Sequence, residues 1–328
     1  MAYDKNEAVS LVIEAGHRLV SAGLIARTWG NISARISDTQ FVITPSGMAY
    51  DRLTPDDIVT VNIADCSYEG DIKPSSEKGI HAESYRLRPD VDFVVHTHQL
   101  YATAYGTLGE ALESGDALLG GNVPCAEYGI SSTKKLKKKV SECIEANPAA
   151  NAFFMRYHGV LCLGKDCDNA FEISLRLEEL CRERVEHALT LTDKTELHEL
   201  PDGLFGKLHE STAIFVSSPA IAEVCKKRGR VRPMIDDMAQ IGGVSFPCIR
   251  EKGNLKRALK GKNAVLIRKG GAVCTGTDAD EAAAVASVLE KNCLAKLYSE
   301  ACGKKHHLGR LDARIQRTVY VMKYSKLK

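Results

Sequence analysis

Two segments of this chain match each other when the sequence is shifted by 112 residues. The first, NAFFMRYHGVLCLGKDCDNA from Asn151, shares Asn, Arg, Gly, Cys, Gly, Asp, Asp and Ala in register with NAVLIRKGGAVCTGTDADEA from Asn263. At slightly different shifts, IFVSSPAI around Ser217 falls on FVVHTHQL, and RPMIDDM from Arg232 falls on VPCAEYG. Self-similarity of this kind indicates repeated units. We therefore expect two related units, the second a partial copy of the first.

Length and composition fit two ordinary domains that act on a small molecule. The chain has 328 residues, 44% hydrophobic and 26% charged, with a formal net charge of +2. This balance gives no general attraction to nucleic acid or to a membrane. Eleven cysteines occur without a CxxC pair, and the polar start MAYDKNEAVS lacks the basic region of a signal peptide. We expect a cytoplasmic protein with reduced thiols.

Three histidines of the first unit form a candidate metal site. An apolar run, FVV, predicts a strand that ends in His96 and His98, and residues i and i+2 of a strand point to the same face. His158 is a third candidate, because Gly159 allows a close backbone approach beside it. A single histidine is more often an ordinary core or surface residue. However, catalytic zinc sites use three protein ligands, and the second copy has lost all three positions: His158 aligns with Gly270, and the other two fall in Ser-Ser-Pro.

Candidate anion-binding groups lie near these histidines in the sequence. A helix predicted in SSEKGIHAESYRLRP leads into the histidine strand, so Glu77 could face the same pocket as a base, a metal ligand or both, or could simply complement the helix dipole. The hydroxyl and N–H groups of Ser75 and Ser76, and the turns Gly30-Asn31 and Ser46-Gly47, are typical anion sites. Each is weak evidence alone, because these are ordinary turn residues. Three such loops beside one metal site suggest a phosphate.

Together these motifs resemble the class II aldolase and adducin-head family, whose members include fuculose-phosphate and rhamnulose-phosphate aldolases and ribulose-phosphate 4-epimerase. The resemblance covers about residues 5 to 195. It is carried by TWGNIS, ITPSG, PSSE, the HTH segment, VPCAEYG and YHGVLCLG with the helix after it, in the order and spacing of the family. The combination is highly specific.

The resemblance implies a role for each matching residue. The divalent metal ligands would be His96, His98 and His158, with Glu77 binding the metal in the resting enzyme and moving a proton. The phosphate loops would comprise Asn31, Ser46, Gly47, Ser75 and Ser76. Tyr128 would protonate the oxygen of the leaving aldehyde across a subunit boundary. One metal ion per chain is implied, zinc by expectation, with manganese or cobalt as alternatives. Such an ion stabilises the enediolate formed when the carbon–carbon bond breaks.

Three features depart from the fuculose-phosphate aldolases. Trp29 stands where they have a small residue beside the Gly-Asn loop, which leaves the substrate open. Glu127 is an additional candidate acid, although an ordinary loop carboxylate is the simpler interpretation. Residues 200 to 328 replace the C-terminal tail that shapes the aldolases' pocket. Tyr320 and Tyr324 could substitute for that tail, but the alternation in RTVYVMKYSKLK favours a packed strand.

The leading functional hypothesis is a metal-dependent aldolase that cleaves a small ketose phosphate to dihydroxyacetone phosphate and an aldehyde. Decarboxylation of a 3-oxo acid phosphate, 4-epimerisation and dehydration use the same metal chemistry and remain alternatives. Tyr128 favours the aldolase over the epimerase. A non-catalytic, adducin-like scaffold is an alternative of another class, against which the intact histidines argue. The expected partner is a small phosphorylated sugar, with neither nucleic acid nor membrane.

The expected fold class is α/β. Residues 1–198 would form a three-layer, class II aldolase-like catalytic domain with helices on both sides of a central, mainly antiparallel sheet. Residues 199–328 would form a smaller, degenerate α/β repeat without catalytic function. Because the family forms symmetric rings, we expect a homo-oligomer in which the second unit takes a position like that of a neighbouring subunit.

Overall fold

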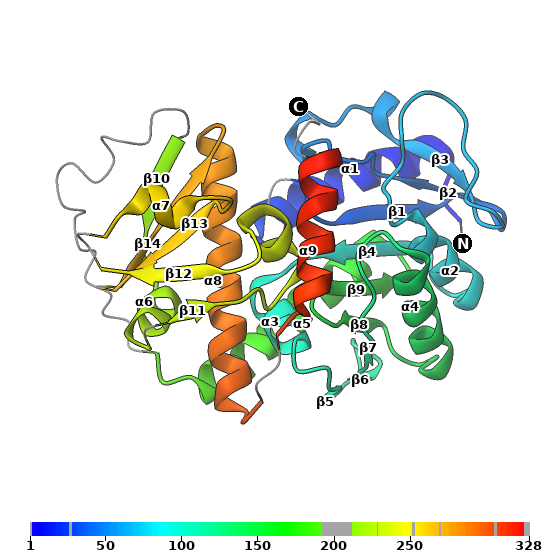
Figure 1. The fold of residues 1–328 in the computed structure, drawn as a ribbon. Coiled ribbons are helices and arrows are strands. Elements are labelled where there is room, and N and C mark those ends of the chain that lie inside the picture. Colours follow the sequence, from blue (N-terminus) through cyan, green and yellow to red (C-terminus); the bar gives the residue numbers. More distant parts are fainter. Residues whose placement is uncertain are drawn as a thin grey trace. The chain divides into compact units, whose positions relative to one another are not determined.

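The computed structural model describes residues 2–25, 28–191, 212–227, 229–250, 253–268, 270–304 and 307–324 (Figure 1). They form two compact units, Met1–Arg182 and Glu183–Lys328. The division falls within helix α5 (Cys167–Ala188). The boundary expected between residues 198 and 199 lies outside the described residues.

A seven-stranded sheet forms the centre of the first unit. Its order is β3-β2-β1-β4-β9-β8-β7, and all neighbours are antiparallel except β7 and β8. The strands of this unit are β1 (Asn31–Arg35), β2 (Gln40–Ile43), β3 (Val59–Asn62), β4 (Phe93–Thr97), β7 (Cys125–Ala126), β8 (Ala152–Met155) and β9 (Gly159–Gly164), with a separate hairpin of β5 (Leu112–Asp116) and β6 (Gly121–Val123). The mainly antiparallel sheet predicted from the sequence is confirmed.

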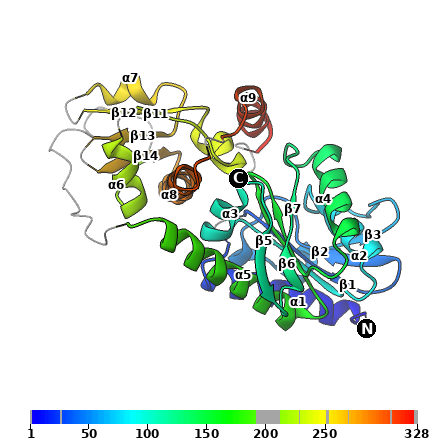
Figure 2. The same ribbon diagram turned by 90° about the horizontal axis from the view of Figure 1, so that it is seen from below.

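Helices cover both faces of this sheet (Figure 2). The helical elements are α1 (Lys5–Ser21), α2 (Lys78–Leu87), α3 (Leu100–Gly106), α4 (Lys134–Ala146), α5, and the 3₁₀ turns Tyr50–Arg52 and Pro55–Asp57. Buried apolar side chains of α2 and α4 pack with Val94 of β4 in one core. Strand residues two apart share a face, so the side chain of His96 lies on the same face of the sheet as that of Val94. His98, two residues further along, continues toward the end of the sheet where α2 begins. The predicted three-layer α/β fold is confirmed.

The second unit contains a five-stranded sheet of order β10-β14-β13-β12-β11, in which β12 and β13 are parallel and the other neighbours antiparallel. Its strands are β10 (Thr212–Val216), β11 (Arg230–Val231), β12 (Phe246–Ile249), β13 (Ala264–Ile267) and β14 (Gly271–Gly276). Its helices are α6 (Pro219–Lys226), α7 (Leu255–Leu259), α8 (Ala279–Ala301) and α9 (Arg310–Val319), with π-helical turns at Met238–Gly242 and Tyr320–Tyr324. Nowhere in the described ranges is a helix long and apolar enough to cross a membrane.

Part of the first unit recurs in the second unit. A shift of 112 residues places β8, β9 and the first residue of α5 on β13, β14 and the first residue of α8 with no offset. The order β4-β9-β8-β7 recurs as β10-β14-β13-β12, with the same strand directions. In its described part the second sheet ends at β10, so β1, β2 and β3 have no counterpart beyond it. The second unit therefore matches only the later half of the first.

Strand pairing corrects the alignment of the histidine segment. The first residue of β4 pairs with the last residue of β9, and the first residue of β10 pairs with the last residue of β14. Since β9 and β14 correspond, β10 corresponds to β4 residue by residue. Phe215 and Ser217 thus take the places of His96 and His98, whereas the sequence match had put Ser217 and Pro219 there. The match was wrong by two residues, but the loss of both histidines stands.

A second correction concerns the segment VPCAEYG. Cys125 of β7 pairs with Phe154, and Cys248 of β12 pairs with Leu266. Leu266 is the counterpart of Phe154 at the shift of 112 residues. The counterpart of VPCAE is therefore FPCIR in β12, and its alignment with RPMIDDM was wrong. The register of a sheet is set by pairing between distant strands, which a short local match does not contain.

The strand expected in RTVYVMKYSKLK is also wrong. Residues 310–319 form α9, and Tyr320 and Tyr324 bound the π-helical turn after it. Leu311, Ile315 and Val319 recur every four residues, which is the helical period. The alternation of apolar residues around Tyr320 covers too few positions to override that period.

Candidate metal centre

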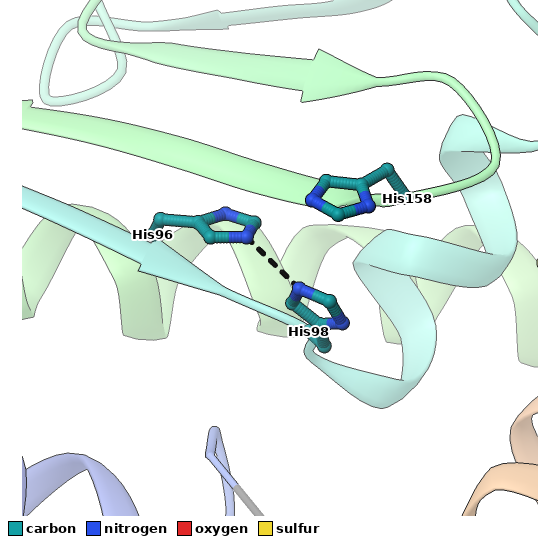
Figure 3. A group of neighbouring side chains, drawn as sticks. All are labelled: His96, His98 and His158. Atoms are coloured by element: carbon teal, nitrogen blue, oxygen red, sulfur yellow. Dashed lines mark hydrogen bonds between the residues drawn. The ribbon is translucent and has the colours of Figure 1, made fainter. Parts of the chain in front are cut away.

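Three imidazoles meet at the ends of β4 and β8 (Figure 3). His96 lies in β4, His98 directly follows it, and His158 lies in the turn between β8 and β9. One nitrogen from each ring lies within 4.8 Å of the others. Within the described ranges this is the only such group of His, Cys, Asp or Glu side chains. All three rings are buried. The structure thus brings together the three histidines named from the sequence.

The hydrogen bonding of these rings suits a cation. His96 Nδ1 lies 2.8 Å from the carbonyl oxygen of Val160, so Nδ1 carries the proton and Nε2 offers a lone pair. That Nε2 faces Nε2 of His98 at 2.9 Å. Burial lowers the pKa of His96 to about 3, so the ring is neutral at physiological pH. Neutral imidazoles with converging lone pairs are what a divalent metal requires.

The carboxylate of Glu77 completes the group. Glu77 is the N-cap of α2, and its oxygens lie 3.0 Å from His158 Nε2 and 3.2 Å from His96 Nε2. Burial by itself would raise the pKa of Glu77, but the imidazoles of His158 and His96 outweigh it and hold that pKa well below the usual range. Three imidazole nitrogens and one carboxylate oxygen match the donor types of a zinc site.

A row of buried polar side chains lies behind Glu77. Asn31 donates from Nδ2 to Glu77 at 3.2 Å and accepts from His81 through Oδ1. The other nitrogen of His81 lies 2.6 Å from the Ser33 hydroxyl, which lies 2.7 Å from the Tyr85 hydroxyl. Burial lowers the pKa of His81 to about 3, so this ring donates from Nε2 and accepts at Nδ1. His81, Ser33 and Tyr85 were not predicted from the sequence.

The two predicted serine loops lie side by side next to Glu77. Their backbones are joined by two hydrogen bonds, from Ser46 N to Lys73 O at 2.9 Å and from Ser75 N to Thr44 O at 3.0 Å. Gly47 has a φ of +80°, a conformation that side chains disfavour. In the joined loops Gly47 is exposed, Ser46 is partly exposed and Ser75 is buried.

Hydroxyl groups link these loops to their surroundings. The Ser75 hydroxyl accepts from the backbone N–H of Glu77 at 3.2 Å, directly at the N-terminus of α2. The Ser76 hydroxyl lies 2.8 Å from that of Ser132. Asn31, assigned to the phosphate loops by resemblance, contacts Glu77 in this structure, and its phosphate role stays a prediction. An anion at the loops would thus sit beside the carboxylate that adjoins the histidines.

Tyr128 packs edge-on against Tyr157, with ring centroids 5.6 Å apart. Tyr157 precedes His158 and has a φ of +62°, which is uncommon for a tyrosine. This left-handed residue closes the turn in which Met155 pairs with Gly159. The role of Tyr128 across a subunit boundary stays a prediction.

Two glycines permit the close packing of the site. A Cβ on Gly159 would lie 2.5 Å from the carbonyl oxygen of Thr97 and 2.9 Å from Cε1 of His96. A Cβ on Gly30 would lie 2.5 Å from the carbonyl oxygen of His96. Any other residue at either place would push the histidine strand away.

The equivalent place in the second unit is filled. Phe215 stands at the position of His96, and its ring would be 2.0 Å from a Cβ on Gly271. Ser217, at the position of His98, donates a hydrogen bond to the carbonyl oxygen of Gly270, at the position of His158. A phenyl ring and a short hydrogen-bonded side chain occupy the space that the imidazoles take in the first unit.

Comparison with known proteins identifies the family. The model of the class II aldolase and adducin N-terminal domain matches residues 10–185 and, again, residues 208–297. The 5-deoxy-D-ribulose 1-phosphate aldolase of Bacillus thuringiensis serovar kurstaki is 33% identical over 171 residues, 51% of this chain and 79% of that protein. A solved L-fuculose 1-phosphate aldolase has a TM-score of 0.51 and 30% identity, covering 60% of this chain and 91% of its own. YgbL from Escherichia coli, 23% identical with a TM-score of 0.51 over 62% of this chain and 98% of its own, shows the fold alone. The chain belongs to the class II aldolase and adducin family.

Proposed function

We propose that this class II aldolase cleaves a small ketose 1-phosphate into dihydroxyacetone phosphate and an aldehyde. The observation that carries the proposal is the buried group of three imidazoles and Glu77 directly beside two joined serine loops. The relatives named for 5-deoxy-D-ribulose 1-phosphate and L-fuculose 1-phosphate support a substrate with phosphate on carbon 1.

The proposed metal ligands are His96, His98 and His158, with Glu77 as the fourth ligand at rest. One divalent ion per chain, zinc by preference and otherwise manganese or cobalt, would supply Lewis-acid stabilisation of the charge that develops on the ketone oxygen. Three imidazoles that converge beside one carboxylate support this choice.

Cleavage moves one proton. The hydroxyl on the carbon that becomes the aldehyde loses a proton, and the neighbouring carbon of the dihydroxyacetone phosphate half gains one. Glu77, oriented by Asn31, would carry the proton to that carbon, and Tyr128 would act at the aldehyde oxygen. The loops of Ser46, Gly47, Ser75 and Ser76 would hold the phosphate, using remote binding energy for orientation.

The proposal is tested by measuring dihydroxyacetone phosphate released from a panel of ketose 1-phosphates, with zinc or manganese and with chelator. Bound metal per chain is measured in parallel for the wild type, His96→Ala and the matched control His187→Ala, an exposed histidine in α5. We expect metal-dependent release and one bound ion, both lost only in His96→Ala. Bound metal without release would favour the decarboxylase, epimerase or dehydratase, and no bound metal would favour the scaffold.

We further propose that the second unit, residues 199–328, arose by partial duplication and is not catalytic. The recurrence of β8, β9 and the start of α5 at one constant shift, together with Phe215 and Ser217 in place of histidines, supports this history. We propose a cytoplasmic homo-oligomer in which Tyr128 serves a neighbouring subunit. Mixing inactive His96→Ala chains with inactive Tyr128→Phe chains should then restore activity, and no recovery would contradict a shared site.

A further inference from the structure

The second unit places two cysteines at a position where the first unit has one cysteine and one glycine. Helix α6 corresponds to α3 and starts at the same place after its strand, so the last residue of α3, Gly106, corresponds to Cys225. Strand pairing makes Cys248 of β12 the counterpart of Cys125 in β7. The thiol of Cys225 is therefore a functional group that the first unit lacks at this junction of helix and strand.

The backbone geometry around the two positions is the same in both units. The Cys125 thiol lies 3.7 Å from the carbonyl oxygen of Gly106, and the Cys248 thiol lies 3.7 Å from the carbonyl oxygen of Cys225. In the first unit a Cβ on Gly106 would lie 3.3 Å from the side chain of Phe154. The second unit has the smaller Leu266 at that position, which leaves room for a cysteine.

The two thiols differ in exposure, since Cys225 is buried and Cys248 is partly exposed. A reactive pair requires one thiol that an oxidant can reach and a second thiol beside it. The Cys248 thiol lies against the backbone of Cys225, 3.7 Å from its carbonyl oxygen, and the Cys225 sulfur, which is buried, lies 3.4 Å from the carbonyl oxygen of Gly271. The neighbouring Cys225 side chain, helped by Arg268, lowers the pKa of the partly exposed Cys248 below its ordinary value. In contrast, burial raises the pKa of Cys125 to about 12. Thiolates are the reactive form of cysteine.

We propose that Cys225 and Cys248 form an oxidisable dithiol site that takes hydroperoxides and closes to a disulfide within the second unit. The Cys248 thiolate attacks one oxygen of hydrogen peroxide, the O–O bond breaks, and hydroxide leaves and takes up a proton to become water. Cys248 is then a sulfenic acid. The Cys225 thiol loses its proton and attacks the Cys248 sulfur, the S–O bond breaks, and a second water leaves. The two thiols supply the two electrons that reduce the peroxide.

Peptide mapping of the full chain tests the site. The protein is treated with hydrogen peroxide, its remaining thiols are alkylated, and it is digested with trypsin without reduction. Lys226, Lys227 and Arg230 separate Cys225 from Cys248, so the disulfide links two peptides. We expect this linked species to form first and to vanish on reduction. Prior oxidation of the exposed Cys302, or linkage of other pairs while Cys248 stays alkylated, would overturn the proposal.

Two variants separate the roles of the pair. In Cys225→Ala, Cys248 has no resolving partner, so we expect no linked peptide and a sulfenic acid that dimedone traps. The matched control is Cys125→Ala, at the corresponding place in the first unit, which should form the linked peptide as the wild type does. Alkylation of the wild type should be faster at Cys248 than at Cys125 at pH 7, and equal rates would overturn the proposal. Neither measurement uses aldolase activity, so failure of one proposal leaves the other standing.

Discussion

At the scale of single residues, the Glu77 carboxylate is oriented by Asn31 and, through Asn31, by His81. Asn31 donates to Glu77, and the neutral ring of His81 fixes the Asn31 amide. We expect His81→Ala to free that amide and to lower zinc affinity and kcat by about 10-fold each, the lower end of the range for groups that orient metal ligands. Zinc titration and steady-state kinetics measure the two effects.

Ser84→Ala is the matched control for this prediction. Ser84 is equally buried in α2, but its hydroxyl donates to the carbonyl oxygen of Ile80 in its own helix. The control should share a cost in stability while keeping zinc affinity. Equal zinc affinity in His81→Ala and the wild type would show that Asn31 needs no such support.

His81 also makes stability depend on pH. Burial lowers its pKa to about 3, whereas the ordinary value is 6.5. Below that ordinary value the unfolded chain takes up a proton that the folded chain does not, so the free energy of unfolding falls as pH decreases, by up to about 1.4 kcal/mol per pH unit from this group. Metal-free His81→Gln should show a shallower loss between about pH 6 and pH 4 in urea unfolding. The exposed-site control His187→Gln should lose stability as steeply as the wild type.

The site residues predicted from the sequence are those whose place follows from the period or the end of a single helix or strand. His96 and His98 follow from the strand period, and Glu77 from its place before a helix. Glu77, His81 and Tyr85 recur every four residues, so one face of α2 could have been recognised as polar and buried. Ser33 could not, because it joins this row from a strand whose position is set by pairing.

At the scale of elements, the hairpin of β8 and β9 fixes the distance between His158 and the histidine strand. We expect Gly159→Ala to force β4 away, because its Cβ would lie 2.5 Å from the carbonyl oxygen of Thr97 and 2.9 Å from the His96 ring. Zinc affinity should fall at least about 10-fold, and the chain should lose about 1–3 kcal/mol of stability. Calorimetric zinc titration and thermal unfolding measure both.

Gly79→Ala serves as the control for that substitution. Its Cβ would meet the flexible end of Lys137, and alanine is the better helix former within α2. We expect unchanged zinc affinity and equal or higher stability. If Gly159→Ala bound zinc like the wild type, the close approach at the hairpin would not be a condition for the site.

The helices and strands themselves were predicted better than the register in which the strands pair. The helices α2, α4 and α5 and the strands of the first sheet follow from period and turn residues, whereas the registers of β10 and β12 did not. Pairing in a sheet joins residues far apart in sequence, and the matches used for β10 and β12 were too short to carry it. The helix α9 was not predicted for a local reason, because RTVYVMKYSKLK contains only the last three residues of its pattern.

At the scale of the whole molecule, the two units share part of one fold, but the proposed metal ligands lie in the first unit. Both units retain the order β4-β9-β8-β7 or its equivalent, but only the first has the imidazoles, and in the second Phe215 and Ser217 fill their place. A ligand that binds the folded state stabilises it by about 2.7 kcal/mol at 100 times its dissociation constant. Zinc should therefore stabilise the first unit alone.

Hydrogen exchange with and without zinc measures this difference within one chain. We expect slower exchange in the amides of β4, β8 and β9, and unchanged exchange in β10, β13 and β14, which serve as the internal control at corresponding positions. The effect should disappear with chelator and in His96→Ala, because the ion then has too few ligands. Equal protection of β13 and β14 would mean either that the second unit binds the metal or that the two units unfold together, and zinc content measured per chain in His96→Ala distinguishes those cases.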